Sequence, residues 1–136
     1  MTHTVRDWMS SPVVVIAPEM SATQALTLMR RRAIHSLVVD LSRQGRTSYG
    51  IIPTSDIRDK IVGEDRDPAS MPVSTLMTAP IVCARPDWTL RQAAVKMKEL
   101  GIHHLPVEDD RGSIVGMISA TDIFLAVEEA GWRPMG

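Results

Sequence analysis

The sequence predicts an α+β fold in which two tandem β-α-β-β-α repeats pack face to face with pseudo-twofold symmetry. The 136-residue chain carries the same pattern of residues twice, and each copy alternates short apolar runs with segments of helical period. Each copy alone is near the lower size limit for a self-sufficient core. A three-stranded sheet with helices on one face also leaves its other face in need of a partner. We therefore expect the two copies to share one core.

The repeat is visible by direct alignment. The segment that starts at Met9 aligns without a gap with the segment that starts at Met77, and "GIIPTSDI" later matches "GMISATDI". Between the copies, "GEDRDPASMP" is charged and contains Gly and Pro, as linkers do. The predicted boundaries are residues 1–63 for the first repeat, 64–72 for the linker and 73–136 for the second repeat.

Each copy begins with a β-branched run next to proline, "PVVVIA" and "PIVCA", which predicts a strand. Ser21 and Thr89 then stand three residues before a glutamine. This is capping-box spacing, so a helix should follow each of them. Two further apolar runs per copy predict a hairpin. The last helix should begin near Thr54 in the first copy and near Ala120 in the second.

Composition sets limits on the kind of protein. The chain is 44% hydrophobic and 23% charged with a net charge of −1, which is typical of a globular protein and predicts no nucleic-acid or membrane partner. The amino terminus has no apolar core of a signal peptide, and no apolar run reaches the length of a membrane span. Cys83 is the one cysteine, which excludes an internal disulfide. We expect a cytoplasmic protein.

The order and repetition of these segments carry a family resemblance. The chain resembles a pair of CBS (cystathionine-β-synthase) domains, a Bateman module, through "DWMSSPVVVIAP", "AIHSLVVD" and "GIIPTSDI" and their later counterparts "TLMTAPIVCARP", "GIHHLPVED" and "GMISATDI". The resemblance implies a regulatory module that is not an enzyme and needs no cofactor. It implies that an adenosine-containing ligand (AMP, ADP, ATP or S-adenosylmethionine) binds in the cleft between the repeats and that occupancy is signalled to a partner protein. It also implies a homodimer.

The phrase around Ser119 suits an anionic ligand. A hydroxyl at the start of a helix adds a donor to the free backbone N–H groups, and Asp122 can accept hydrogen bonds from two ribose hydroxyls. The same Ser-x-x-Asp spacing is also an ordinary helix cap worth about 1 kcal/mol. Spacing alone favours the cap, and the repeat context favours the site.

The resemblance implies two clefts. Their aliphatic members are also expected to be core residues for most of their area. The main cleft would be lined by Val14, Ile34, His35, His104, Met117, Ser119 and Asp122, and a second, weaker cleft by Ile51, Thr54, Asp56, Val82, Ile102 and His103.

Histidines gather at the start of the second strand of each copy. His103 and His104 are adjacent, so a strand would point them to opposite faces and they are poorly placed to share one metal ion. The segment resembles the gamma subunit of the AMP-activated kinase, which implies a phosphate contact for His104 and a cleft-lining place for His35 or His103. Each histidine equally fits a partly buried residue whose polar atoms bond the backbone.

Pro53 stands in the first copy where the second has Ser119. Proline has no hydroxyl and no backbone N–H, so it removes two potential phosphate donors. We expect the second cleft to be weak, empty or selective for a ligand with less phosphate. Two other functions stay open: a structural oligomerisation module with empty clefts and, less favoured, a histidine-based metal sensor or small enzyme.

Overall fold

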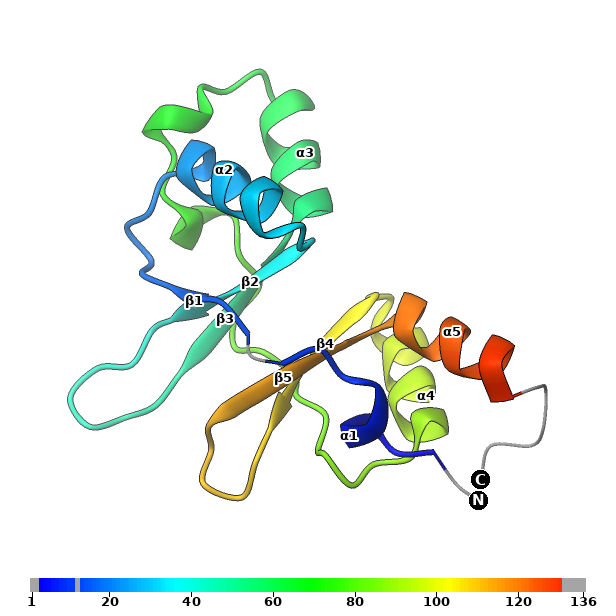
Figure 1. The fold of residues 1–136 in the computed structure, drawn as a ribbon. Helices are drawn as coiled ribbons and strands as arrows, with labels where there is room; N and C mark the ends of the chain where they lie inside the picture. The colour runs from blue at the N-terminus through cyan, green and yellow to red at the C-terminus, as the bar shows by residue number, and fades with distance from the viewer. Residues whose placement is uncertain (1–2, 12, 131–136) are drawn as a thin grey trace. The chain divides into compact units, whose positions relative to one another are not determined.

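The computed structural model describes residues 3–11 and 13–130, and its helices and strands form an α+β fold (Figure 1). The chain divides into two compact units. The first-repeat unit is Val14–Ile81, and the second-repeat unit combines the chain up to Val13 with the chain from Val82 onward. Among the described residues, no helix is both long and apolar enough to cross a membrane.

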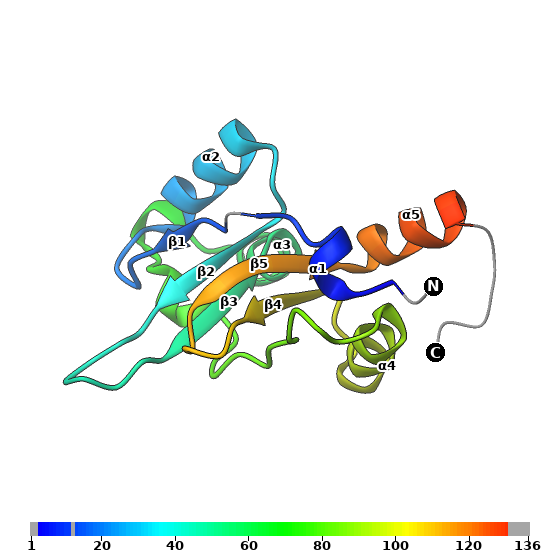
Figure 2. The same ribbon diagram turned by 60° about the horizontal axis from the view of Figure 1, so that its bottom comes forward.

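The first-repeat unit contains a three-stranded sheet and two helices. Its elements are β1 (Val15–Ile16), α2 (Ala22–Arg32), β2 (Ser36–Asp40), β3 (Tyr49–Pro53) and α3 (Thr54–Val62). The strand order is β1-β2-β3, with β1 parallel and β3 antiparallel to β2, and Figure 2 shows the three strands side by side. Two short 3₁₀ helices, Pro68–Ser70 and Val73–Thr75, follow α3.

The core of this unit follows the period of its elements. Leu37, Val39 and Ile52 alternate along β2 and β3 onto one face of the sheet, as strand geometry requires. They pack against apolar residues of α2, α3 and the segment after α3, namely Ala22, Ala25, Met29, Ile57, Ile61, Met71, Val73 and Leu76.

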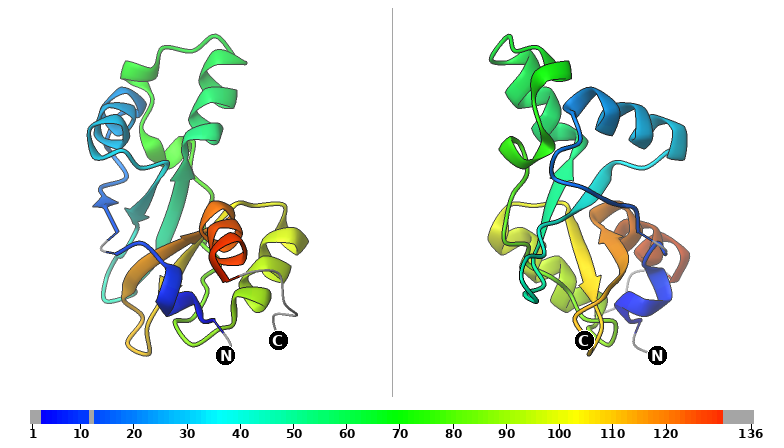
Figure 3. Two further views of the ribbon diagram at one scale, coloured as in Figure 1. Left: turned by 45° about the vertical axis from the view of Figure 1, so that its right-hand side comes forward. Right: turned by 90° about the vertical axis from the view of Figure 1, so that its left-hand side faces the viewer.

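The second-repeat unit contains the two-stranded sheet β4-β5, two long helices and one short helix. Its elements are α1 (Val5–Trp8), α4 (Leu90–Leu100), β4 (His104–Glu108), β5 (Ile114–Ser119) and α5 (Ala120–Ala130). Figure 3 shows α4 and α5 close together, and the short helix α1 comes from the start of the chain. The core holds Leu105, Val107 and Ile118 of the sheet together with Val5, Ala84, Leu90, Ala93, Met97 and Ala126.

The predicted helix starts are confirmed. Ser21 accepts from the Gln24 N–H, while the Gln24 side chain accepts from the Ser21 N–H, and Thr89 and Gln92 form the same reciprocal pair. α3 and α5 begin at Thr54 and Ala120 as expected. Sequence pattern alone was enough here because a cap is a local interaction.

The predicted first strands are shorter than expected. In the first repeat only Val15–Ile16 is a strand, and in the second the run around Cys83 contributes a single parallel bridge, between Ala84 and Val107. The prediction of a three-stranded sheet in each repeat is therefore wrong for the second repeat, whose sheet has the two strands β4 and β5.

Pro106 explains this difference. In the first repeat the Val38 N–H donates to the Val14 carbonyl at 3.1 Å. Pro106 is the counterpart of Val38 and has no N–H to donate, so Val82 loses the matching bond. The pairing is limited to two hydrogen bonds at Ala84, two residues after Val82: the Ala84 N–H donates to the Pro106 carbonyl, and the Ala84 carbonyl accepts from the Glu108 N–H.

Each unit is completed by a segment that precedes the other repeat in the sequence. Ser10 exchanges two backbone hydrogen bonds with Met117 of β5, both 2.9 Å long, and Thr78 exchanges two with Ile51 of β3, also 2.9 Å long. The close approach depends on glycine, because a Cβ added to Gly116 would lie 2.5 Å from Met9 Sδ. A Cβ on the corresponding Gly50 would meet Met77 Sδ at 2.7 Å.

The segment predicted as a linker is partly packed. The Ala22 N–H donates to the Met71 carbonyl at 2.8 Å, and the Met71 side chain is buried in the core of the first-repeat unit. The predicted boundaries follow the repeat in the sequence, whereas the compact units divide the chain after Val13 and after Ile81.

We predict that Pro106→Val extends the first strand of the second repeat. The new amide should donate to the Val82 carbonyl, as that of Val38 does to Val14, and become protected from hydrogen exchange. The free energy of unfolding should change by less than about 1 kcal/mol, because the added bond is offset by a more flexible unfolded chain. Exchange at position 106 as fast as in an exposed loop would contradict this account of the short strand.

Candidate functional site

The start of α5 carries Ser119 and Asp122. β5 ends at Ser119 and α5 begins at the next residue, so no loop separates the strand from the helix. The Ser119 N–H donates to Asp122 Oδ2 at 2.8 Å, and the Asp122 N–H donates to Ser119 Oγ at 3.1 Å. The two residues thus form a reciprocal helix cap in the free protein. Among the described residues, Asp122 Oδ1 has no hydrogen-bond partner.

The neighbouring side chains come from one face of the β4–β5 ladder. His104 is paired with Ser119 and Pro106 with Met117, so these four residues share a face. The opposite face is the buried one, with Leu105 and Ile118 fully enclosed. The unit therefore gathers His104, Met117, Ser119 and Asp122, four of the residues predicted for the main cleft, at the start of α5.

The corresponding start of α3 is built differently. Pro53 stands at the cap position and makes no side-chain cap hydrogen bond. The Thr54 hydroxyl donates to the His35 carbonyl at 2.8 Å, and the Thr54 N–H reaches the same oxygen at 2.9 Å. In the second repeat the Ala120 N–H bonds the His103 carbonyl at 2.9 Å. The Thr54 hydroxyl, predicted to line the second cleft, is therefore already engaged by the backbone.

Asp56 lacks the partner that Asp122 has. Because Pro53 carries no N–H, the carboxylate of Asp56 has no hydrogen-bond partner within the described part of the chain. Burial raises the pKa of Asp56 above its usual value, the positive charge of Lys60 lowers it by a smaller amount, and Asp59 adds to the increase. The carboxylate is thus available to a hydroxyl donor and is stabilised as an anion less well than an ordinary aspartate.

The remaining predicted site residues are distributed over both units. In the first-repeat unit, Val14 and Ile34 pack against the core and His35 is exposed. Ile51 lies on β3, on the opposite face from Ile52. In the second-repeat unit, Ile102 packs against the core, His103 is exposed, and Val82 is 42% exposed.

The histidines and Cys83 bear on the alternative of a metal sensor or small enzyme. Among the described residues, no three His, Cys, Asp or Glu side chains are grouped so that they could hold a metal ion. Burial raises the pKa of the Cys83 thiol to about 12, and the negative charge of Glu108 contributes to the increase. The thiol is therefore protonated at neutral pH and a poor nucleophile.

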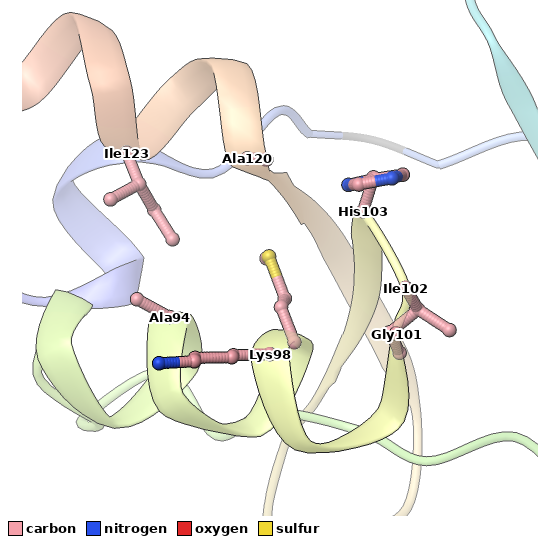
Figure 4. A pocket seen from close by; sticks show the side chains of 8 residues that line it. Ala94, Lys98, Gly101, Ile102, His103, Ala120 and Ile123 are labelled. Atoms are coloured by element: carbon pink, nitrogen blue, oxygen red, sulfur yellow. The ribbon is translucent and has the colours of Figure 1, made fainter.

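A pocket between α4 and α5 was not anticipated. It has a volume of about 430 Å³ and is lined by Ala94, Met97, Lys98, Gly101, Ile102, His103, Ala120 and Ile123 (Figure 4). Only Ile102 and His103 belong to the predicted sets. The available signal was the difference between aligned helix positions, Leu26 in the first repeat and Ala94 in the second.

We predict opposite pH responses for two aspartates. At pH values above the ordinary pKa of aspartate, Asp56 holds its proton more tightly in the folded protein than in the unfolded chain, because its pKa is raised. Its contribution to the free energy of unfolding therefore falls as the pH rises. Relative to wild type, Asp56→Asn should gain stability as pH rises from about 3.8 to 7. Denaturant unfolding at several pH values measures this difference.

Asp40→Asn is the matched control. Hydrogen bonds from Ser42 lower the pKa of Asp40. The wild-type carboxylate therefore stabilises the fold at pH values above the ordinary pKa of aspartate, and this stabilisation is lost as the pH falls below it. The Asp40 variant should therefore lose stability, relative to wild type, as pH rises through the acid range. The same slope in both variants would show that burial does not control Asp56.

Comparison with known proteins identifies the family. The model of the CBS domain matches residues 5–63 and 73–129. Inosine-5′-monophosphate dehydrogenase of Korarchaeum cryptofilum is 30% identical over 112 residues, which are 82% of this chain and 22% of that enzyme. Protein MK0525 of Methanopyrus kandleri is 27% identical over 82% of this chain, and the match covers 56% of that protein. This chain therefore spans only part of the length of these relatives.

Solved structures agree. The hexameric CBS-CP12 protein from bloom-forming cyanobacteria has a TM-score of 0.88 and 26% identity over 98% of this chain and 78% of that one. The CBS domain pair of protein MJ0100, in complex with 5′-methylthioadenosine and S-adenosyl-L-methionine, has a TM-score of 0.77 and 25% identity over 90% of this chain and 98% of that one. With two matched repeats and the fold of solved CBS pairs, this chain belongs to the CBS domain family and carries two tandem copies of the domain.

Proposed function

We propose that this CBS pair is a regulatory module whose main ligand site is built around Ser119 and Asp122, binds an adenosine-containing molecule and signals occupancy to a partner protein. The observation that carries the proposal is the start of α5, where a hydroxyl, a carboxylate and a helix amino terminus meet. A phosphate oxygen can accept from the hydroxyl, and the helix dipole favours its charge. Asp122 Oδ1 is available for a ribose hydroxyl.

The solved MJ0100 pair supports this ligand class, since it was captured with two adenosine derivatives. AMP, ADP, ATP and S-adenosylmethionine are the candidates. The family resemblance alone assigns Val14, Ile34 and His35 to the same ligand. We propose a binding function without enzymatic activity or a required cofactor, in keeping with the match of the CBS domain to both repeats and with the solved MJ0100 pair, which holds adenosine derivatives. A thermal-shift panel of these ligands tests the proposal, since specific binding raises the melting temperature.

Homodimerisation is a second candidate property, favoured by the surface of α5. Phe124 is 73% exposed and Leu125 is 47% exposed, and large apolar side chains in contact with water are typical of interaction surfaces. The cyanobacterial CBS-CP12 protein is hexameric. Sedimentation of Phe124→Ser beside wild type would test it; an unchanged mass for the variant would contradict a contact through Phe124.

We predict that Asp122→Glu separates ligand binding from helix capping. Glutamate is a good partner in a capping box, so the free energy of unfolding should stay within about 0.5 kcal/mol of wild type. The added methylene should displace the carboxylate from the ribose and weaken nucleotide binding, measured by calorimetry. Unchanged affinity at unchanged stability would show that Asp122 serves only as a helix cap and does not contact the nucleotide.

We predict that the Asp122 and Asp56 sites differ in nucleotide affinity and that Pro53→Ser reduces the difference. The wild-type chain should show one strong site, removed by Asp122→Ala and barely altered by Asp56→Ala. A serine at position 53 would supply a hydroxyl and an N–H and would strengthen the second site. As an N-cap of α3 it would also raise the free energy of unfolding by about 1 kcal/mol. A hydrogen bond to a charged group is worth roughly 1.5–3 kcal/mol, which corresponds to about tenfold or more in affinity. Two equal sites in the wild-type protein would contradict this prediction.

A further inference from the structure

The pocket between α4 and α5 lies wholly within the second-repeat unit. Its wall is mostly apolar, with Ala94, Met97, Ile102 and Ile123 among its lining residues. Figure 4 shows Ile123 projecting from α5 toward α4, where Ala94 lies. A volume of about 430 Å³ is within the range of small-molecule sites. The pocket is therefore large enough for a compact organic ligand.

The corresponding positions of the first repeat carry a larger or a more deeply buried side chain. Leu26 occupies the position of Ala94 and packs against the core of its unit. Ile57, the counterpart of Ile123, is 1% exposed, whereas Ile123 is only partly buried. The pocket thus lies where the second repeat has a smaller side chain and a less buried isoleucine than the first repeat.

The polar groups of the pocket favour an anion. Lys98 lines it and has no ion pair in the described part of the chain, since the nearby Glu99 pairs with Lys96 at 3.7 Å. The exposed imidazole of His103 can donate a hydrogen bond in either protonation state. None of the lining residues is acidic, so the pocket offers no carboxylate to a ribose and differs in chemistry from the Asp122 site.

We propose that this pocket is a further ligand site, distinct from the Ser119/Asp122 site, for a small molecule that joins an apolar body to one anionic group, such as a medium-chain monocarboxylate. The apolar body lies against Ala94, Met97 and Ile123, and the anion is held by Lys98. The proposal rests on the pocket and its charges and does not depend on the adenosine site.

The test is calorimetry of octanoate binding to the full chain, with octan-1-ol as the uncharged control. Octanoate should bind saturably at one site per chain, and octanol should bind about tenfold more weakly or not at all. Lys98→Gln should weaken octanoate about threefold to tenfold and leave octanol unchanged. Equal binding of the acid and the alcohol would overturn the assignment of an anion site.

A pair of exchanged substitutions locates the site. Ala94→Leu installs the residue that the first repeat already accommodates, and it should reduce octanoate affinity at least about tenfold. Leu26→Ala makes the reciprocal change in the first repeat and should leave octanoate affinity unchanged. Full affinity in Ala94→Leu would overturn the proposal. If that variant fails to fold, as shown by its thermal melt, the Lys98→Gln result decides.

Two further outcomes would contradict the proposed octanoate site. Competition between AMP and octanoate would show a single shared site in place of two. Absence of octanoate binding, together with a change in sedimentation caused by Ala94→Leu, would show that a second copy of the chain occupies the pocket.

Discussion

Pairing of a pre-repeat segment with the last strand of each unit is the constraint on which the rest of the structure depends. Ser10 bonds to Met117, and Thr78 bonds to Ile51, in both cases through two backbone hydrogen bonds. Both pairings pass a glycine that allows a methionine to approach where a Cβ would collide. Because Met117 lies two residues before Ser119, the same pairing holds the strand that delivers the candidate ligand-binding residues to the start of α5.

The two helix starts show how one residue changes the chemistry of a repeated motif. With serine at the cap position, hydroxyl, amide and carboxylate satisfy one another, and within the described part of the chain one carboxylate oxygen makes no hydrogen bond. With Pro53 in that place, the amide and the hydroxyl are both missing, and the partly buried Asp56 has no hydrogen-bond partner among the described residues. An unpaired acceptor in a partly buried place destabilises the free protein and favours any donor that reaches it.

The two repeats also differ at single positions that open or shorten local structure. Pro106 replaces Val38, and one lost N–H limits the first strand of the second repeat to a bridge at Ala84. Ala94 replaces Leu26, and a pocket lies between α4 and α5 at that place. Both units keep a core, because the buried strand face (Leu37, Val39 and Ile52; Leu105, Val107 and Ile118) and the buried stripe of the first long helix are the same in both.

The sequence by itself determined the repeat, the order of its elements and the caps at Ser21 and Thr89, because alignment, periodicity and capping are local properties of the chain. It also placed Ser119 and Asp122 together, since they lie one turn apart. The short first strands, the exchange of the pre-repeat segments and the pocket beside Ala94 were decided only by tertiary structure. Strand pairing depends on an N–H supplied by a distant partner, and a pocket depends on the combined volume of side chains from separate elements.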